Sequence, residues 1–378
     1  MIPTRLLFGF FAVSWLPWFT PEEPEEPPPP PEPVVEEIIV EPPPPPEPPA
    51  PVLFPDPLPF HPTLEVGNLG MTYANACASC HKTTFAQWDV STHHLGAQST
   101  VWLDAIRSFG DGTVCTSCHK PLSTQHEQLT TEIIENDVAR PVMEDNANWN
   151  PNWQTESVGC ASCHVREGVV VGNKTSESPH PVRNSKVLST SEACQTCHQF
   201  QLPNEDAPIY NTYQEWKNSA YANAGIQCQD CHMTTGSILG QGQGNHQMNL
   251  EAKQGLTITL QTPSLVFRRN QETTLSVIVH NTGVGHSWPG SSPFVTKELI
   301  VRIVNDDNKT LMKDITHPLG AHRQEDTQGP SIAVGNQHAF TNTFTLSSRI
   351  RDSYGFLQVL YRKGDSEELL HNVRIEIR

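Results

Sequence analysis

The chain has 378 residues, a formal net charge of −17 at pH 7 and 34 prolines. This length is enough for two folded domains and a spacer. The acidic balance excludes electrostatic binding of nucleic acids or of an anionic membrane surface, and it favours either a basic protein partner or simple solubility.

The first 20 residues contain an apolar run from Leu6 to Phe19 behind a single Arg5. The run is short for a membrane span, and it lacks a clear small-residue cleavage site. Residues 1–20 are therefore expected to be either a cleaved signal peptide or an N-terminal membrane anchor.

Residues 21–63 are dominated by proline and glutamate, as in PEEPEEPPPPPEP. Such a segment cannot bury a core, and its prolines favour an extended polyproline conformation of about 3.1 Å per residue. We expect a stiff linker. It serves either as a stalk between a membrane anchor and the following domain or as a disordered, acidic segment without a specific role.

Ten cysteines follow in five Cys-x-x-Cys pairs, and histidine comes directly after every pair. The motifs are Cys77, Cys80 and His81; Cys115, Cys118 and His119; Cys160, Cys163 and His164; Cys194, Cys197 and His198; and Cys228, Cys231 and His232. Disulfides would place no demand on the next residue, and a zinc ribbon has no use for five histidines at one offset. The pattern is the signature of c-type haem attachment, in which two thiols bond the porphyrin and the adjacent imidazole binds the iron.

The motifs therefore predict five haem c groups, and they predict export, because haem is attached to this motif outside the bacterial or archaeal cytoplasm. We expect a periplasmic or extracellular protein. The first cysteines of successive motifs lie 34 to 45 residues apart. Segments of that length are too short to wrap each haem separately, so the porphyrins must supply much of the core. Residues 64–252 are expected to be a pentahaem domain of short helices and long loops.

Five irons with imidazole on both sides need five further histidines as distal ligands. The first candidates, His93 and His94, end the segment FAQWDVSTHH, whose Trp-x-x-Ser recurs in YQEWKNSAYA with Tyr221 at the position of His93. His126 follows its own motif too closely in sequence to reach the same haem. His180, His246 and His286 lie in loops framed by proline or glycine. The candidate distal ligands are His93, His94, His126, His180, His246 and His286.

From about residue 253 the cysteines stop and alternating β-branched runs begin, such as TTLSVIVHN and KELIVRIV. Their spacing predicts an Ig-like, all-β sandwich of about seven strands over residues 253–378. The expected fold class is therefore α+β and multidomain. If His286 reaches a haem, its loop locks the two domains together.

The segment from Cys77 to about Gly290 resembles a family of multihaem c-type cytochromes, namely pentahaem proteins with a C-terminal β domain. They are related to the tetrahaem cytochrome that accepts electrons from hydroxylamine oxidoreductase. The matching pieces are WDVSTHH, VGCASCHVREGVVVG, SPHPV, ACQTCHQF, YQEWKNSAYANAGIQCQDCHM, GNHQM and NTGVGHSWPG. The resemblance implies closely packed, mostly bis-histidine haems, with distal imidazoles at His93, His126, His180, His246 and His286. His94 stands where the family often has a small residue.

We expect an electron-transfer protein with a protein donor and a protein acceptor, and no catalytic residues. No Cys-x-x-Cys-Lys variant of the kind used by ammonia-forming nitrite reductases is present, and the candidate histidines suffice for five irons. Two alternatives stay open. One is a self-assembling subunit of a conductive filament, in which a histidine of one copy binds a haem of the next. The other is a haem enzyme acting on nitrite, hydroxylamine or a sulfur compound at one open iron.

Overall fold

The computed structural model describes residues 73–378 except for short internal gaps at 109–112, 138–139, 154, 167–168, 174, 176–179, 202–205, 235–243, 291 and 323–326. The expected signal peptide or anchor and the expected linker lie outside the described residues. Within the described ranges, no helix is long and apolar enough to cross a membrane. By its contacts this part of the chain lies within one compact unit, which is not divided near residue 252.

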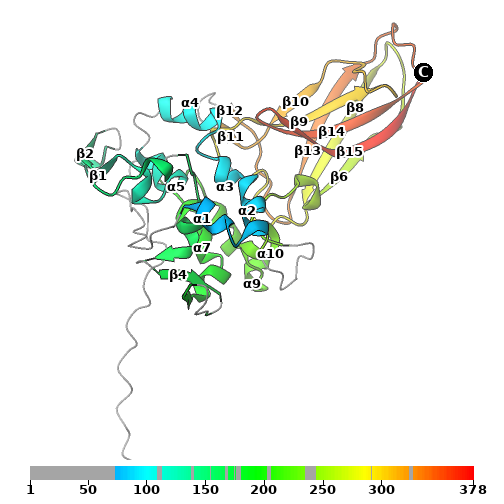
Figure 1. Ribbon diagram of the computed structural model, residues 1–378. Coiled ribbons are helices and arrows are strands. Elements are labelled where there is room, and N and C mark those ends of the chain that lie inside the picture. Colours follow the sequence, from blue (N-terminus) through cyan, green and yellow to red (C-terminus); the bar gives the residue numbers. More distant parts are fainter. Residues whose placement is uncertain are drawn as a thin grey trace, which may run out of the picture. The chain divides into compact units, whose positions relative to one another are not determined.

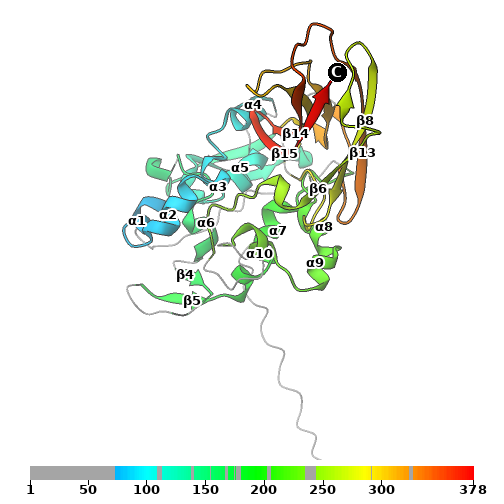
Figure 2. The same ribbon diagram turned by 90° about the vertical axis from the view of Figure 1, so that its right-hand side faces the viewer.

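All five haem-attachment motifs lie on or beside short helices (Figures 1 and 2). These helices are α1 (Ala74–Ala78), α5 (Thr113–His119), α6 (Cys160–His164), α7 (Glu192–His198) and α10 (Cys228–His232). Each is far shorter than the 12–15 residues or so that an isolated helix needs for stability in water. Packing must therefore hold them in place, as expected for a region of short helices and loops.

The Trp-x-x-Ser repeat forms two similar helix pairs. The first is α2 (Lys82–Asp89) with α3 (Thr92–Leu95), and the second is α8 (Thr212–Lys217) with α9 (Ala220–Asn223). Each serine caps the second helix of its pair: Ser91 Oγ accepts the His94 N–H at 3.2 Å, and Ser219 Oγ accepts the Tyr221 N–H at 3.2 Å. The serine thus begins the second helix of each pair and sets the direction of the residues that follow.

The rest of the motif region consists of small elements with a small apolar core. They are α4 (Thr100–Ser108), η1 (Ser123–Gln125), η2 (Ile134–Asn136), η3 (Pro151–Trp153), η4 (Lys186–Ser189), η5 (Ala252–Gln254), the hairpin of β1 (Gln128–Ile133) and β2 (Pro141–Asp145), and the sheet of β3 (Val165–Arg166), β4 (Val169–Gly172) and β5 (Val182–Asn184). Among the described residues of this region, the buried apolar cluster consists of Leu122, Trp153, Ala161 and Val165. Other buried apolar residues of this region, such as Trp88, Trp102 and Phe200, lie outside the cluster. This lack of one large apolar core fits a core completed by porphyrins.

The C-terminal region is built from two main sheets. One has the strand order β10 (Ile315–Pro318), β9 (Lys297–Val304), β14 (Tyr354–Lys363), β15 (Ser366–Ile377) and β7 (Val266–Phe267); the other has the order β13 (Gln337–Thr345), β8 (Glu272–Asn281) and β6 (Leu256–Gln261). A short hairpin of β11 (Ala321–His322) and β12 (Thr327–Gln328) is separate. Neighbouring strands are antiparallel, except that β7 runs parallel to β15.

Both sheets contribute to one apolar core. On β8 the alternate residues Leu275, Val277 and Val279 are almost fully buried, and Leu357 and Val359 of β14 join the same cluster. This period of two is the pattern of a strand with one buried face. Two main sheets are therefore observed in this part of the chain, while the Ig-like sandwich and the bounds of a domain over residues 253–378 stay predictions.

Candidate haem-binding site

Four of the five motif histidines face a second imidazole. The ring centroids are 6.2 Å apart for His81 and His180, 6.3 Å for His93 and His198, 6.1 Å for His164 and His246, and 6.3 Å for His232 and His286. In each pair the partner comes from a segment far from the motif in sequence. The structure thus brings together four of the imidazole pairs that the sequence analysis sought.

The separation of these rings fits a metal ion between them. Imidazole nitrogens that bind one ion from opposite sides through bonds of about 2.0 Å lie about 4 Å apart, which places the ring centroids about 6 Å apart. Direct ring stacking or hydrogen bonding would bring two imidazoles closer than this. The observed range of 6.1–6.3 Å therefore matches bis-imidazole ligation of iron.

Hydrogen bonds to the backbone orient several of these rings. Nδ1 of His164 lies 3.0 Å from the Val171 carbonyl, and Nδ1 of His246 lies 2.7 Å from the Gly244 carbonyl. Contacts of this kind fix the ring and leave Nε2 for a metal. In contrast, Nδ1 of His93 and of His180 is buried without a partner among the described residues.

Burial keeps the imidazoles of His119 and His198 neutral. Desolvation, assisted by the charge of His93, lowers the pKa of His119 to about 4; desolvation together with four neighbouring histidines lowers the pKa of His198 to about 4. A metal binds imidazole only in its neutral form. At neutral pH these side chains are therefore already in the state that iron ligation requires.

Cysteines from different motifs meet in pairs. The side chains of Cys77 and Cys160 perturb each other's pKa, as do those of Cys118 and Cys197 and those of Cys194 and Cys228, so these cysteines of different motifs lie near one another. In addition, Cys163 interacts electrostatically with Cys194 and Cys197. The five attachment points therefore form one connected group. The fourth motif adjoins the second, third and fifth.

The β region contributes one imidazole to this group. His286 lies on the loop after β8, and its ring is nearly parallel to that of His232, with 13° between the planes. Two hydrogen bonds hold this loop against α8 and α9: the Ser287 N–H donates to Glu215 Oε2 at 3.0 Å, and the Tyr221 hydroxyl donates to the Thr282 carbonyl at 3.1 Å. The second copy of the Trp-x-x-Ser repeat thus fixes the β loop, whereas the first places His93.

The structure separates the roles of the neighbouring histidines 93 and 94. The His94 ring stacks on Trp88 with 4.1 Å between centroids, and its Nδ1 lies 2.8 Å from the Asp89 carbonyl. The His93 ring faces His198 instead. Of the two candidate ligands, His93 is therefore the one placed at a motif histidine.

The role of His126 as a distal ligand stays a prediction. Its Nε2 lies 2.6 Å from the Lys120 carbonyl. The short chain between Lys120 and His126 folds the ring back onto the backbone of its own motif.

The His119 ring is stacked by Trp102, with 4.4 Å between centroids. Gly96 lies beside the same ring, since a Cβ at this position would be 3.3 Å from His119 Nδ1. Within the described ranges, no imidazole faces His119 at the distance seen in the other four motifs.

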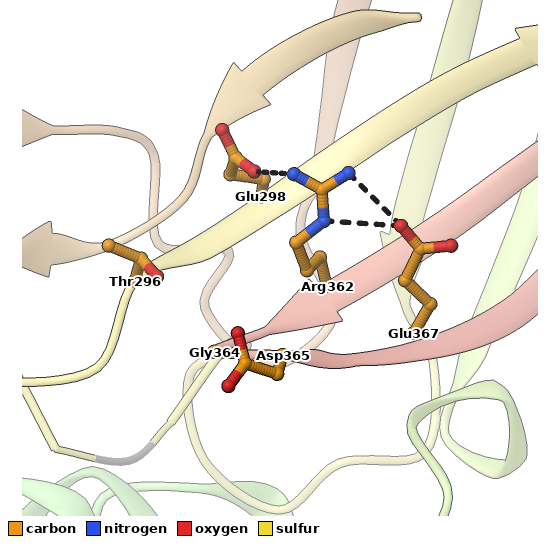
Figure 3. Close-up of a pocket in the computed structure, with 6 residues that line it drawn as sticks. All are labelled: Thr296, Glu298, Arg362, Gly364, Asp365 and Glu367. Atoms are coloured by element: carbon orange, nitrogen blue, oxygen red, sulfur yellow. Dashed lines mark hydrogen bonds and ion pairs between the residues drawn. The ribbon is translucent and has the colours of Figure 1, made fainter. Parts of the chain in front are cut away.

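A pocket of about 450 Å³ lies on the β region, where Thr296, Glu298, Arg362, Gly364, Asp365 and Glu367 line it (Figure 3). The Arg362 guanidinium is held there by Glu298 at 2.8 Å and by Glu367 at 3.0 Å. Its charge is thus compensated within the sheet, and the pocket contains none of the motif residues. We assign it no functional role.

Sequence reasoning did not single out Trp102 or Glu156. Trp102 is nearly fully buried against His119, and Glu156 is a buried carboxyl between the first and third motifs. Neither residue belongs to a repeat or a motif. Only the unusual placement of a glutamate four residues before a Cys-x-x-Cys pair could have drawn attention to Glu156.

Comparison with solved structures identifies a similar fold. The chain is similar to a penta-heme cytochrome c552 from Thermochromatium tepidum, with a TM-score of 0.55 and 13% sequence identity over 82% of this chain and 100% of that chain. An identity this low shows a shared multihaem cytochrome fold and no more. The relation to the acceptor of hydroxylamine oxidoreductase stays a prediction.

Weaker similarities cover about a third of the chain. A CARDB domain from Pyrococcus furiosus matches 32% of this chain and 87% of its own at 15% identity with a TM-score of 0.21, and the C-terminal domain of Wzt matches 33% and 74% at 12% identity with a TM-score of 0.22. Scores this low carry no argument about the fold. No protein-family model and no curated protein matches the chain.

Proposed function

We propose that the protein is an exported multihaem c-type cytochrome that transfers electrons through five covalently attached haems. The observation that carries this proposal is the set of four motif histidines that each face a second imidazole at 6.1–6.3 Å. When bound, each haem would supply a one-electron carrier at its iron.

The chain's own residues would hold and tune these carriers. In each motif the two cysteines attach the porphyrin and the adjacent histidine binds the iron. The distal imidazoles are His180, His93, His246 and His286, for the first, fourth, third and fifth motifs in that order. Two imidazoles keep an iron six-coordinate in both oxidation states, so few atoms move when an electron arrives. Such an arrangement favours electron transfer over catalysis.

The contacts between cysteines suggest a route. The first motif adjoins the third through Cys77 and Cys160, and the third adjoins the fourth through Cys163. From the fourth motif the route divides, to the second through Cys118 and to the fifth through Cys228. Electrons entering at the haem of the first motif would thus reach a branch point at the haem of the fourth motif, which Cys194 and Cys197 attach.

The acidic chain favours basic redox proteins as donor and acceptor, because opposite charges steer encounter between protein partners. Attachment of haem implies a periplasmic or extracellular location. Residues 1–20 would direct export and either leave as a signal peptide or remain as an anchor, with residues 21–63 as the spacer.

A second candidate function rests on the different surroundings of His119. With Trp102 at its side and no imidazole opposite it among the described residues, an iron bound by His119 would keep a position open. That position suits a small ligand such as nitrite or hydroxylamine, or a histidine from a second copy of the chain. The first occupant would indicate an enzyme, and the second a filament.

Haem stoichiometry tests the main proposal. We expect the exported protein to carry five haems per chain by its alkaline pyridine spectrum, with a matching intact mass after denaturation, and to take up five electrons in an electrode titration. Fewer than five covalent haems, or haems that cannot be reduced reversibly, would rule out the proposed carrier.

A further inference from the structure

Glu156 is a buried carboxyl that the proposed electron route does not use. Only 7% of its surface is exposed. Its Oε1 accepts the Ala74 N–H at 2.5 Å, whereas Oε2 is buried with no hydrogen-bond donor among the described residues. A buried carboxylate oxygen without a partner is costly, so this atom calls for an explanation beyond helix capping.

The carboxyl group lies where two haem-attachment helices meet. Ala74 begins α1, which carries Cys77, and Gly159 directly precedes α6, which carries Cys160. A Cβ on Gly159 would lie 2.5 Å from Glu156 Oε2, so glycine is what lets the carboxyl approach this closely. Because Ala74 lies three residues before Cys77 and Gly159 directly before Cys160, Glu156 lies beside the attachment points of the first and third motifs.

The surroundings of Glu156 favour its neutral form. Desolvation raises the pKa of this carboxyl, and the Ala74 N–H and the charge of His94 offset only part of that increase. Among the described residues, the titratable groups that interact with Glu156 are Cys77, Cys160 and His94. Haem attachment turns both cysteines into thioethers that do not titrate, and His94 is paired with Asp89.

We propose that Glu156 is the proton acceptor that couples proton uptake to reduction of the haems held at the first and third motifs. This inference rests on the proposed function, which supplies the electron from a redox donor. One electron reaches the iron held by His81 or His164, and one proton from solvent forms an O–H bond at the Glu156 carboxylate. The added negative charge is thereby cancelled close to where it arrives.

Electrostatics determines how haem reduction changes the proton affinity of Glu156. An oxidised haem carries one more positive charge than a reduced haem, and that charge stabilises the carboxylate. Reduction removes it, so Glu156 binds its proton more tightly in the reduced protein. Between the pKa values of the two states, the potential falls by up to about 59 mV for each tenfold fall in proton concentration. Below both pKa values and above both, the potential is independent of pH.

The test is a spectroelectrochemical titration of the full holoprotein at a series of pH values, for the wild type and for Glu156→Gln. Glutamine keeps an acceptor for the Ala74 N–H but cannot take up a proton. We expect two of the haem potentials to depend on pH in the wild type and to lose that dependence in the variant. Glu368→Gln is the matched control, because Glu368 also accepts backbone N–H groups, from Ala252 and Lys253, but lies in the β region.

Infrared difference spectra of the wild type make the test independent of the variant's folding. A carboxylic acid band should appear on reduction and should not move when the haem propionates are isotope-labelled through aminolaevulinate. A band that moves with the label, or pH dependence that persists in Glu156→Gln, would assign the proton to a propionate or to His94 and overturn the inference. Potentials that do not vary with pH would also overturn it. Haems that cannot be reduced at all would instead refute the proposed function.

Discussion

Replacing His93 with alanine is expected to convert one low-spin haem into a high-spin, five-coordinate haem. The His93 ring faces the motif histidine His198, and no other described imidazole lies in that position. Loss of the distal ligand should remove about one quarter of the low-spin absorbance and raise the potential of that haem by on the order of 0.1 V, because axial ligands tune haem potentials over about 0.8 V. Optical and EPR spectra of the oxidised holoprotein measure the change.

His94→Ala is the matched control for this experiment. It removes an imidazole one position along the same helix, but this ring stacks on Trp88 and pairs with Asp89. The spin state of all haems should be unchanged in this variant. If His94→Ala produced the high-spin haem and His93→Ala did not, the assignment of these two histidines would be reversed.

A chain produced without haem attachment should fold only in its β region. Among the described residues, the β region has nineteen residues in one buried apolar cluster, whereas the cluster of the motif region has four members. Other buried apolar side chains of the motif region, such as Trp88 and Phe200, do not join this cluster. Each fully buried aliphatic or aromatic side chain stabilises by about 1.5–3 kcal/mol, so we expect this divided core to be too small to offset the entropy of ordering the motif region. Residues 73–250 should therefore be unfolded and residues 255–378 folded.

Hydrogen exchange of the haem-free, full-length chain measures this difference. We expect protected amides on β8, β9, β14 and β15 and rapid exchange on α1, α6, α7 and α10. The holoprotein should protect both regions. Protected motif helices in the haem-free chain would show that the polypeptide alone supplies a sufficient core.

Several features could be predicted from the sequence because local chemistry dictates them. The motif helices are short because each consists of little more than the five residues of its Cys-x-x-Cys-His motif. The alternation of β-branched residues over TTLSVIVHN appears in the structure as β8 with one buried face. The choice of His180, His246 and His286 relied on proline and glycine that shape their loops, and the structure places each of them at a motif histidine.

Other features depend on contacts between segments that are distant in sequence. The choice between His93 and His94 is made by the cap at Ser91 and by the stacking of His94 on Trp88, which single-sequence patterns do not reveal. The sequence indicates that His126 is too close to its own motif to reach the same haem, but it does not reveal that its Nε2 lies against the Lys120 carbonyl. The surroundings of Glu156 form only when α1 and α6 come together. The N–H that donates a hydrogen bond to its carboxylate belongs to Ala74, which is 82 positions away.

Low-temperature EPR of the oxidised holoprotein, with its haem content and solution mass determined on the same sample, tests the central claim most directly. We predict five haems per chain, of which four are low-spin with two imidazole ligands and one, bound by His119, is high-spin in the monomer. A low-spin fifth haem found only in an assembly would place a histidine from a second copy at that iron. Two or more high-spin haems in the intact monomer would contradict the four imidazole pairs on which this account rests.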